Sequence, residues 1–278
     1  MASLSGTDNG KSKAMSSPLQ CLVDAHQLTS QAKILNKLPS DTNQCWLVRD
    51  DGHDTENSLW VVKKLRFDSL SVDWDQLVNN TLQAEAANLT PLLTYADTHA
   101  GYLLMPYREA HNLLQSGWSK QEKITFLAKV ASSIHMSPLQ FKPMDLYEEV
   151  KGYIQRLENS AAKETFLSEL LNLPDLQQQT VLMEQTLVPA HMDLSFSNIL
   201  VNGEILDWEY ARQTLPVVEL AFSATINKLT DSESRYLFDC YSELQNRNES
   251  FESFEIYRLW SQLLNRIWYH VANEATSF

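Results

Sequence analysis

Hydrophobic positions in the first part of the chain recur at two different spacings. Short apolar runs rich in Val, Leu and Trp alternate with polar stretches, which is the pattern of strands joined by loops. We expect these strands at residues 44–48, 58–65, 91–95 and 101–107. Residues 18–35 and 73–89 have helical spacing instead. This part of the chain is therefore predicted to form a small sheet with an inserted helix.

Beyond this part of the chain the apolar positions have mainly helical spacing. We expect helices over residues 121–135, over residues 146–171 and from residue 216 to the end. Residues 199–205 are the exception, because Asn202 and Gly203 between apolar residues favour a two-residue hairpin turn. The pattern predicts an α+β fold with two lobes. A β-rich N-lobe should span residues 19–107, and a larger helical C-lobe should span residues 108–278.

The composition and the cysteine spacing predict a soluble, cytoplasmic protein. Of the 278 residues, 44% are hydrophobic and 21% are charged, as is usual for a soluble globular protein. Residues 1–18 are rich in Ser, Gly and other small polar residues without a following apolar run, so we expect a disordered tail and no secretory signal. Cys21, Cys45 and Cys240 lack the spacing of a zinc or redox motif. Three reduced thiols in a cytoplasmic protein are the simplest interpretation.

Net charge narrows the possible partners. The formal charge is -13, and nucleic acids and acidic membranes are bound through clustered Lys and Arg, so both are poor partners. From residue 108 onward there are 23 Asp and Glu against 14 Lys and Arg. This acidic lobe suits a cationic substrate, although acidity also serves solubility alone. The sequence does not indicate an oligomeric state.

One segment carries residues suited to phosphoryl transfer. Asp193 follows His191 by two residues, Asn198 follows Asp193 by five, and Asp207 comes after the predicted hairpin. Phosphoryl transfer needs one carboxylate to accept the proton of the attacking hydroxyl. It also needs a carboxylate and an amide oxygen to hold Mg²⁺ against the nucleotide phosphates. A loop followed by a hairpin would place these side chains around one cavity. We expect His191 to brace the loop and Asp193 to do the chemistry.

A metal-dependent hydrolase that uses His191, Asp193 and Asp207 is an alternative from another class. Such sites usually contain several histidines. No second histidine lies near His191 in the sequence, so we rank this alternative low.

The same segment resembles a known superfamily. Residues 190–211, followed by residues 218–221, resemble the catalytic loop and metal-binding segment of the aminoglycoside phosphotransferase and choline kinase superfamily. Within it they look most like bacterial thiamine kinase. The resemblance implies a protein-kinase-like bilobal fold and the use of ATP and Mg²⁺. It implies that Asn198 and Asp207 hold the metal, and that Glu219 supports the catalytic loop together with His191.

Looser matches assign a nucleotide site to the N-lobe. Lys63 matches the lysine that grips the α- and β-phosphates, and Glu85 matches the glutamate that pairs with it. Met105 and Tyr107 lie in a stretch that looks like the hinge strand, whose backbone would bind adenine. Thr42 would contact phosphate in the turn at residues 39–43.

That turn departs from the family pattern because it contains no glycine. Glycine allows the backbone to approach phosphate closely. Asp41 would also bring a negative charge near the nucleotide. A catalytically impaired kinase-like protein, which binds nucleotide or acts as a scaffold, is therefore the alternative function.

Two features favour a small molecule over a protein as the acceptor. Met192 stands where regulated protein kinases use an arginine, and Asp207 is separated from Glu219 by only eleven residues, too few for a peptide-binding activation segment. We expect thiamine as the substrate, with choline, ethanolamine and an aminoglycoside next. Trp208, Glu209 and Tyr210 are candidate substrate contacts. A packing role is favoured over ligand binding for the more distant aromatic residues Tyr257, Trp260, Trp268 and Tyr269, because the first three fall on a stripe with the spacing of a helix core.

Overall fold

The first part of the protein forms a five-stranded antiparallel sheet in the order β1-β2-β3-β5-β4. The computed structural model describes residues 18–40, 43–52, 58–65, 73–174, 187–245 and 250–274. The expected tail, apart from its last residue, and Thr42 lie outside the described residues. The strands are β1 (Lys33–Leu38), β2 (Gln44–Arg49), β3 (Leu59–Lys64), β4 (Tyr95–Asp97) and β5 (Tyr102–Pro106). Three predicted strands are confirmed, whereas the predicted strand at residues 91–95 becomes extended only at its last residue.

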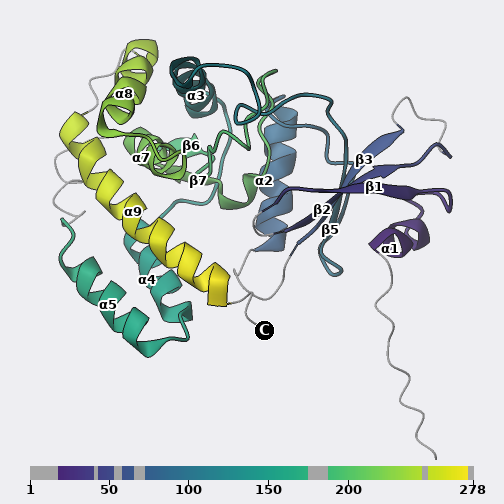
Figure 1. Ribbon diagram of the computed structural model, residues 1–278, viewed down its shortest axis with the longest axis horizontal. Coiled ribbons are helices and arrows are strands. Elements are labelled where there is room, and N and C mark those ends of the chain that lie inside the picture. Colours follow the sequence, from purple (N-terminus) through teal and green to yellow (C-terminus); the bar gives the residue numbers. More distant parts are fainter. Residues whose placement is uncertain are drawn as a thin grey trace, which may run out of the picture.

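Two helices cover the two faces of this sheet (Figure 1). Helix α1 (Pro18–Asp24) packs on one face through a cluster that includes Leu104, and α2 (Trp74–Ala86) packs on the other through a cluster that includes Leu103. Successive side chains of a strand point to opposite faces. Because Lys63 is paired in register with Leu103, it shares the α2 face, which turns toward the rest of the protein.

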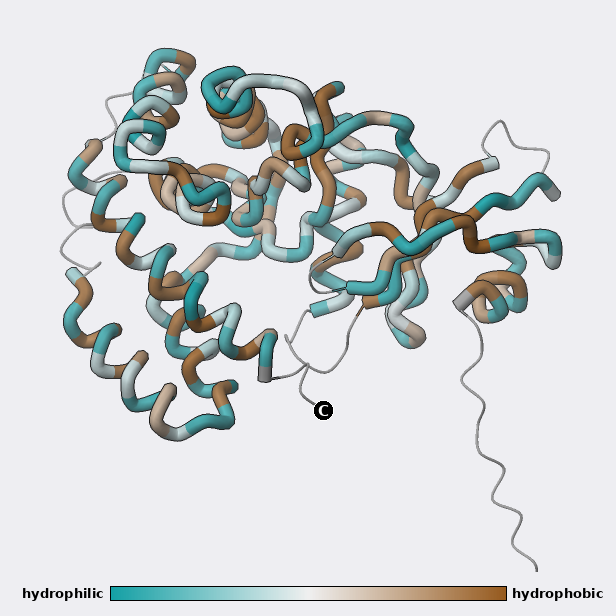
Figure 2. The backbone as a smooth tube through the Cα atoms, in the orientation of Figure 1, coloured by the Kyte–Doolittle hydropathy of each residue, from teal (hydrophilic) through white to brown (hydrophobic). Residues whose placement is uncertain are grey.

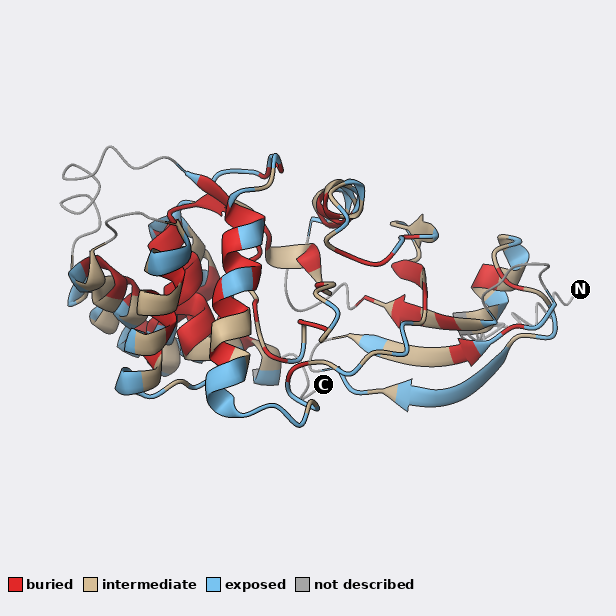
Figure 3. Cartoon of the chain, turned by 90° about the horizontal axis from the view of Figure 1, so that it is seen from above, coloured by how far each residue is buried: buried red, intermediate tan, exposed pale blue. Residues whose placement is uncertain are grey.

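The helix predicted over residues 18–35 is wrong in its second half. Helix α1 ends at Asp24, the backbone turns through His26 at a positive φ of 58°, and Lys33 begins strand β1. Strand β1 is the exposed edge of the sheet (Figure 3). Its residues are held by backbone pairing with β2, so the spacing of their side chains says nothing about a buried helical face.

The rest of the chain is mainly helical and surrounds one large apolar core. The helices are α3 (Lys120–His135), α4 (Leu146–Arg156), α5 (Ser160–Leu171), α7 (Pro216–Ile226), α8 (Asp231–Gln245) and α9 (Phe251–Glu274). Helix α7 is buried along nearly its whole length and is contacted by α3, α8 and α9. In Figure 2, α9 alternates between hydrophilic and hydrophobic residues, as expected for a helix with one face on the core.

Two local predictions in this part need correction. The single helix expected over residues 146–171 is two helices, because the Asn159 side chain accepts a hydrogen bond from Ala162 N and starts α5 anew. The hairpin at residues 199–205 is reduced to one bridge between Ile199 and Ile205, closed by a turn in which Gly203 has a φ of 92°. The turn residue was predicted correctly, and the strands beside it are shorter than expected.

A sheet followed by a helical region confirms the predicted α+β class. The short strands β6 (Val188–Ala190) and β7 (Arg212–Thr214) pair with each other, and the 3₁₀ turn η1 (Trp208–Tyr210) precedes β7. Helix α2 contacts η1, which joins the sheet region to the helical region. Among the described helices, none combines the length and the apolar content needed to cross a membrane. The exact lobe boundary after Tyr107 stays a prediction.

The large core yields a test of the fold. Leu127 of α3 is fully buried in this core, so Leu127→Ala should lower the free energy of unfolding by about 2–5 kcal/mol through lost burial and a cavity. Leu82→Ala is the matched control, because Leu82 of α2 is 47% exposed and its truncation should change stability by less than about 0.5 kcal/mol. Urea unfolding of both variants measures the difference. Equal losses would contradict this description of the core.

Candidate active site

A buried histidine shapes the loop that follows β6. His191 Nδ1 accepts a hydrogen bond from Asp193 N at 3.2 Å, and Nε2 lies 2.8 Å from Leu206 O. Since a carbonyl oxygen only accepts, Nε2 carries the proton and Nδ1 does not. Burial lowers the pKa of His191, although Glu219 and the Leu206 carbonyl oppose this, so the ring is neutral. A neutral ring with both nitrogens occupied is suited to bracing the loop.

Glu219, in the first turn of α7, holds the same loop by its backbone. Its Oε2 accepts from His191 N at 2.5 Å and its Oε1 accepts from Met192 N at 2.9 Å. Glu219 is fully buried, and Met192 has a positive φ of 67°. Two charge-assisted hydrogen bonds therefore stabilise a backbone conformation that L-residues rarely adopt.

The loop presents Asp193 and Asn198 to each other. Asn198 Nδ2 donates to Asp193 Oδ2 at 2.8 Å and to Asp193 O at 3.0 Å. Burial raises the pKa of Asp193 well above its usual range, and the negative charges of Glu209 and Asp207 raise it further. A carboxylate with a raised pKa is a better proton acceptor than an ordinary aspartate.

Lys63 crosses from the sheet to the segment after the predicted hairpin. Its Nζ lies 2.7 Å from Asp207 Oδ1 and 3.3 Å from Glu209 Oε2. The Lys63 and Glu209 side chains are only 3% and 7% exposed, whereas Asp207 is 36% exposed. Asp207 has a φ of 64°, in the left-handed region. Lys64, the neighbour of Lys63, lies over the Tyr102 ring and does not join this cluster.

The charges in this cluster depend on one another. Burial alone would lower the pKa of Lys63, but Asp207 and Glu209 outweigh it and raise this pKa, so the ammonium stays charged. Burial raises the pKa of Glu209, while Lys63 and a hydrogen bond from Asn43 act in the opposite direction. Together with Asp193, the site contains three carboxylates and a single lysine. This excess of negative charge favours the binding of a cation.

The ion pair expected between Lys63 and Glu85 is wrong. Lys63 is bound by Asp207 and Glu209, and Glu85 Oε2 instead accepts a hydrogen bond from Leu93 N at 3.0 Å. Glu85 sits near the end of α2, and this bond ties the helix to the chain leading into β4. The position of Glu85 in the sequence matched the family glutamate, but it did not determine which group the Glu85 carboxylate would contact.

Trp208 is also misassigned as a substrate contact. Its side chain is fully buried, Nε1 donates to Ile205 O at 3.1 Å, and its ring lies against the His191 ring with centroids 4.7 Å apart. It packs the segment that carries Asp207 against the catalytic loop. A side chain enclosed in this way has no free surface for a ligand.

Tyr210 lies beside the acidic cluster and contacts α9. Its hydroxyl accepts a hydrogen bond from Trp268 Nε1 at 3.3 Å. Burial raises the pKa of Tyr210, and the charge of Glu209 raises it further. Trp268 is half-buried, in contrast to the core residues Tyr257 and Trp260 on the same helix. Tyr210 and Trp268 thus bring two aromatic rings close to Glu209.

The expected adenine-binding strand is β5, but one of its donors is occupied. Tyr107 N donates to Leu59 O at 3.0 Å, so this N–H extends the sheet and is not available to a base. Met105 is paired with Val61 in register and lies on the α2 face of the sheet. Ser40 Oγ accepts a hydrogen bond from Asn43 N at 3.3 Å, and residues 41 and 42 between them lie outside the described residues.

No individual role was predicted for three residues at or beside this site. Cys45 is opposite Lys63 in the β2–β3 register, and burial raises the pKa of its thiol. Asn43 contacts Glu209, and Asn80 of α2 contacts the backbone of η1. The register of two adjacent strands could have found Cys45. Asn43 is the last residue of the stretch matched to the phosphate turn, whereas no local pattern marks Asn80.

The donor set fits a hard cation held jointly with phosphates. Asp207 and Asn198 would supply the oxygen ligands. Asn198 uses its Nδ2 on Asp193, which leaves its Oδ1 for a metal. Within the described residues, no group of three or more His, Cys, Asp or Glu is arranged to hold a metal ion. Mg²⁺ is commonly held by one or two protein ligands together with substrate phosphates and water.

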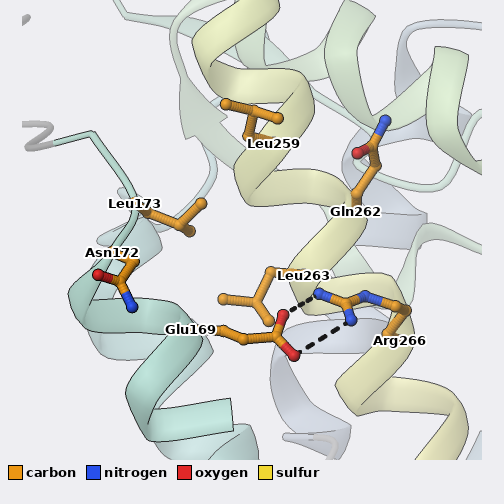
Figure 4. Close-up of a pocket in the computed structure, with 7 residues that line it drawn as sticks. All are labelled: Glu169, Asn172, Leu173, Leu259, Gln262, Leu263 and Arg266. Atoms are coloured by element: carbon orange, nitrogen blue, oxygen red, sulfur yellow. Dashed lines mark hydrogen bonds and ion pairs between the residues drawn. The ribbon is translucent and has the colours of Figure 1, made fainter. Parts of the chain in front are cut away.

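A separate hollow lies between α5 and α9, with a volume of about 340 Å³ (Figure 4). An ion pair between Glu169 and Arg266 crosses it, and Leu173, Leu259 and Leu263 line it. None of its lining residues belongs to the candidate site.

Comparisons with known proteins show the fold and the family of the chain. No curated protein sequence matches the chain significantly. The choline kinase LicA from Streptococcus pneumoniae has the same fold, with a TM-score of 0.72 and 19% identity over 94% of this chain and 91% of that chain. That kinase has also been solved with AMP. An ethanolamine kinase from Plasmodium vivax gives a TM-score of 0.69 at 11% identity, covering 94% of this chain and 83% of its own.

A type VIII aminoglycoside-3'-phosphotransferase gives a TM-score of 0.58 at 16% identity, covering 84% of this chain and 93% of its own. These likenesses confirm the predicted protein-kinase-like α+β fold. The family model described as "Phosphotransferase enzyme family" matches residues 86–249, more than half of the chain, including the catalytic loop and the Asp207 segment. The chain therefore belongs to the phosphotransferase enzyme family.

Proposed function

We propose that this phosphotransferase moves the γ-phosphoryl group of ATP to a hydroxyl of a small cationic molecule, with thiamine as the favoured acceptor. The observation that carries the proposal is the meeting of Lys63, from the sheet, with the segment that carries Asp193 and Asp207, more than 100 residues later in the chain. Asp207 and Lys63 are in direct contact, and their charges reach the half-buried Asp193 carboxylate. One such site can hold the nucleotide phosphates and a hydroxyl together.

Asp193 is the proposed general base. Its carboxylate would accept the proton of the acceptor hydroxyl while that oxygen forms a bond to the γ-phosphorus and the bond to the leaving oxygen of ADP breaks. The Asn198 amide fixes the Asp193 oxygens, and the neutral His191 ring fixes its backbone. The raised pKa supports this role because a base is most effective when its pKa approaches the working pH.

Lys63, Asp207 and Asn198 are the proposed nucleotide-side residues. Mg²⁺, when bound by Asp207 and Asn198, would neutralise charge on the phosphates. Asp207 is the most exposed member of its cluster, so its carboxylate can be reached from solvent. Lys63 keeps its positive charge, as a phosphate ligand must. The contributions of Met105, Tyr107 and Thr42 to nucleotide binding remain predictions.

The acceptor side of the site supports a cation. Glu209 is close to Tyr210, which contacts Trp268, so a carboxylate and two aromatic rings are grouped together. Aromatic faces attract cations, and the excess acidic charge of the C-terminal part acts in the same direction. These features suit the thiazolium ring of thiamine, and they would also suit choline, ethanolamine or an aminoglycoside.

The acceptor is tested by direct competition. At fixed ATP and Mg²⁺, kcat/KM for thiamine should exceed that for choline, ethanolamine and an aminoglycoside, measured as acceptor-dependent release of ADP. If choline wins by tenfold, a difference of about 1.4 kcal/mol in transition-state binding, the acceptor is wrong and the phosphotransferase stands. If no alcohol stimulates ADP release, the impaired kinase-like protein replaces the proposal.

Two aspartates should fail in different ways. Asp193→Ala should lower kcat by about 10²–10⁴-fold while nucleotide with Mg²⁺ still binds, because only the proton acceptor is lost. Asp207→Ala should abolish binding of the Mg²⁺-nucleotide, measured by isothermal titration. Asp231→Ala, at an exposed position on α8, is the control and should leave both quantities unchanged. Similar effects of the first two variants on binding would refute the assignment.

The pH profile tests the electrostatics of Asp193. Because the base must be ionised, kcat/KM should fall as the pH decreases through the raised pKa of Asp193, which places the acid limb above the range of an ordinary aspartate. Glu209→Gln removes one of the negative charges that raise this pKa, so the limb should move to lower pH. Glu148→Gln changes an exposed carboxylate and should not move it. A limb unmoved by Glu209→Gln would contradict the coupling.

A further inference from the structure

Helix α2 reaches the metal-binding segment through a buried asparagine. Asn80 is 1% exposed, and its Nδ2 donates to Trp208 O at 3.3 Å and to Ala211 O at 3.4 Å. These two carbonyls lie at the two ends of the η1 turn, and the Trp208 carbonyl also accepts from Ala211 N. A single amide with two hydrogens therefore spans the whole turn.

The turn begins directly after Asp207, whose backbone is in the left-handed region. On the side before Asp207, the chain is held by the helical region: Leu206 O is bound by His191, and Leu206 N donates to Asn198 O. On the side after Asp207, Asn80 of α2 donates hydrogen bonds to the turn. The position of the Asp207 carboxylate thus depends on hydrogen bonds from both sides.

The same turn carries Glu209, which binds Lys63. Since Glu85 does not pair with Lys63, the ion pair expected to couple α2 to the site is replaced by another contact. Asn80 provides that coupling, because it fixes the backbone between the two carboxylates that bind Lys63.

We propose that Asn80 is a positioning residue, which holds the η1 turn so that Asp207 is set to bind the metal. This inference rests on the proposed function. Asn80 of α2 would thus support metal binding indirectly, through its hydrogen bonds to two backbone carbonyls, without contacting the nucleotide or the acceptor.

Gln83 offers a matched control, one turn further along α2. Its Nε2 donates to Gln140 O at 3.0 Å, and its Oε1 accepts from Gln140 N at 2.9 Å. Gln83 and Asn80 thus each make two hydrogen bonds from α2 to backbone of the following region. Only those of Asn80 end on the segment next to Asp207. Loss of Gln83 tests helix docking without disturbing the η1 turn.

The affinity for Mn²⁺, used as a probe of the metal site, is measured in the presence of a non-hydrolysable ATP analogue. The electron paramagnetic resonance signal of free Mn²⁺ gives the fraction that is bound. Asn80→Ala should weaken Mn²⁺ binding by about 10-fold or more, the usual effect of losing a residue that orients a metal ligand. Asn80→Ser keeps one hydrogen-bond donor, so its affinity for Mn²⁺ should lie between those of Asn80→Ala and the wild type. Gln83→Ala should bind Mn²⁺ as the wild type does. The Mg²⁺ concentration for half-maximal ADP release should follow the same order, while the KM for the acceptor stays constant.

Wild-type Mn²⁺ binding by folded Asn80→Ala would overturn the proposal, and so would equal weakening by Gln83→Ala. If Asn80→Ala does not fold, Asn80→Ser decides, because wild-type binding by that variant has the same meaning. A wild-type protein that binds no Mn²⁺ with the nucleotide analogue would overturn the proposed function itself, before any variant is compared.

Discussion

The burial of the Lys63 ammonium between two carboxylates is the constraint on which the site depends. Removing a charge from water costs several kcal/mol, and only well-placed partners offset that cost. Asp207 and Glu209 are these partners, and they lie more than 140 residues away in the sequence. The sheet and the helical region must therefore meet in one arrangement. The same contact that joins them also gathers the charges that phosphoryl transfer requires.

Around this contact, the helical region supplies rigidity. Glu219 of the buried helix α7 fixes the backbone of the catalytic loop, and the neutral His191 ring links that loop to the segment before Asp207. Asp193 is held close to two other carboxylates, which raise its pKa together with burial. Local backbone strain at Met192 and Asp207 is sustained by these surrounding bonds. The charge pattern and the loop geometry thus have one structural cause.

The sequence allowed residues of one local segment to be predicted to lie together, but it did not predict the long-range contacts of that segment. His191, Asp193, Asn198 and Asp207 are close in the chain, so their spacing alone indicated one loop. The partner of Lys63 could not be inferred in this way, because Glu85 and Asp207 were both acidic candidates and only packing of α2 decides between them. Tertiary packing also explains why Trp208 was wrongly predicted to contact the substrate and why Asn80 was not predicted to have a role. Burial of a side chain and long-range hydrogen bonds produce no periodic pattern in the sequence. In the exposed strand β1, by contrast, the apolar residues had helical spacing, which led to a wrong prediction.

The central claim is that this site transfers phosphate from ATP to an alcohol and not to water. Phosphorus NMR of a mixture of the protein, ATP, Mg²⁺ and thiamine follows each phosphorus atom directly. The account predicts that the γ-phosphate resonance disappears while ADP and one new phosphomonoester resonance grow in equal amounts, and that neither change occurs without an acceptor alcohol. An unchanged ATP spectrum with every cationic alcohol, or growth of inorganic phosphate alone, would contradict it.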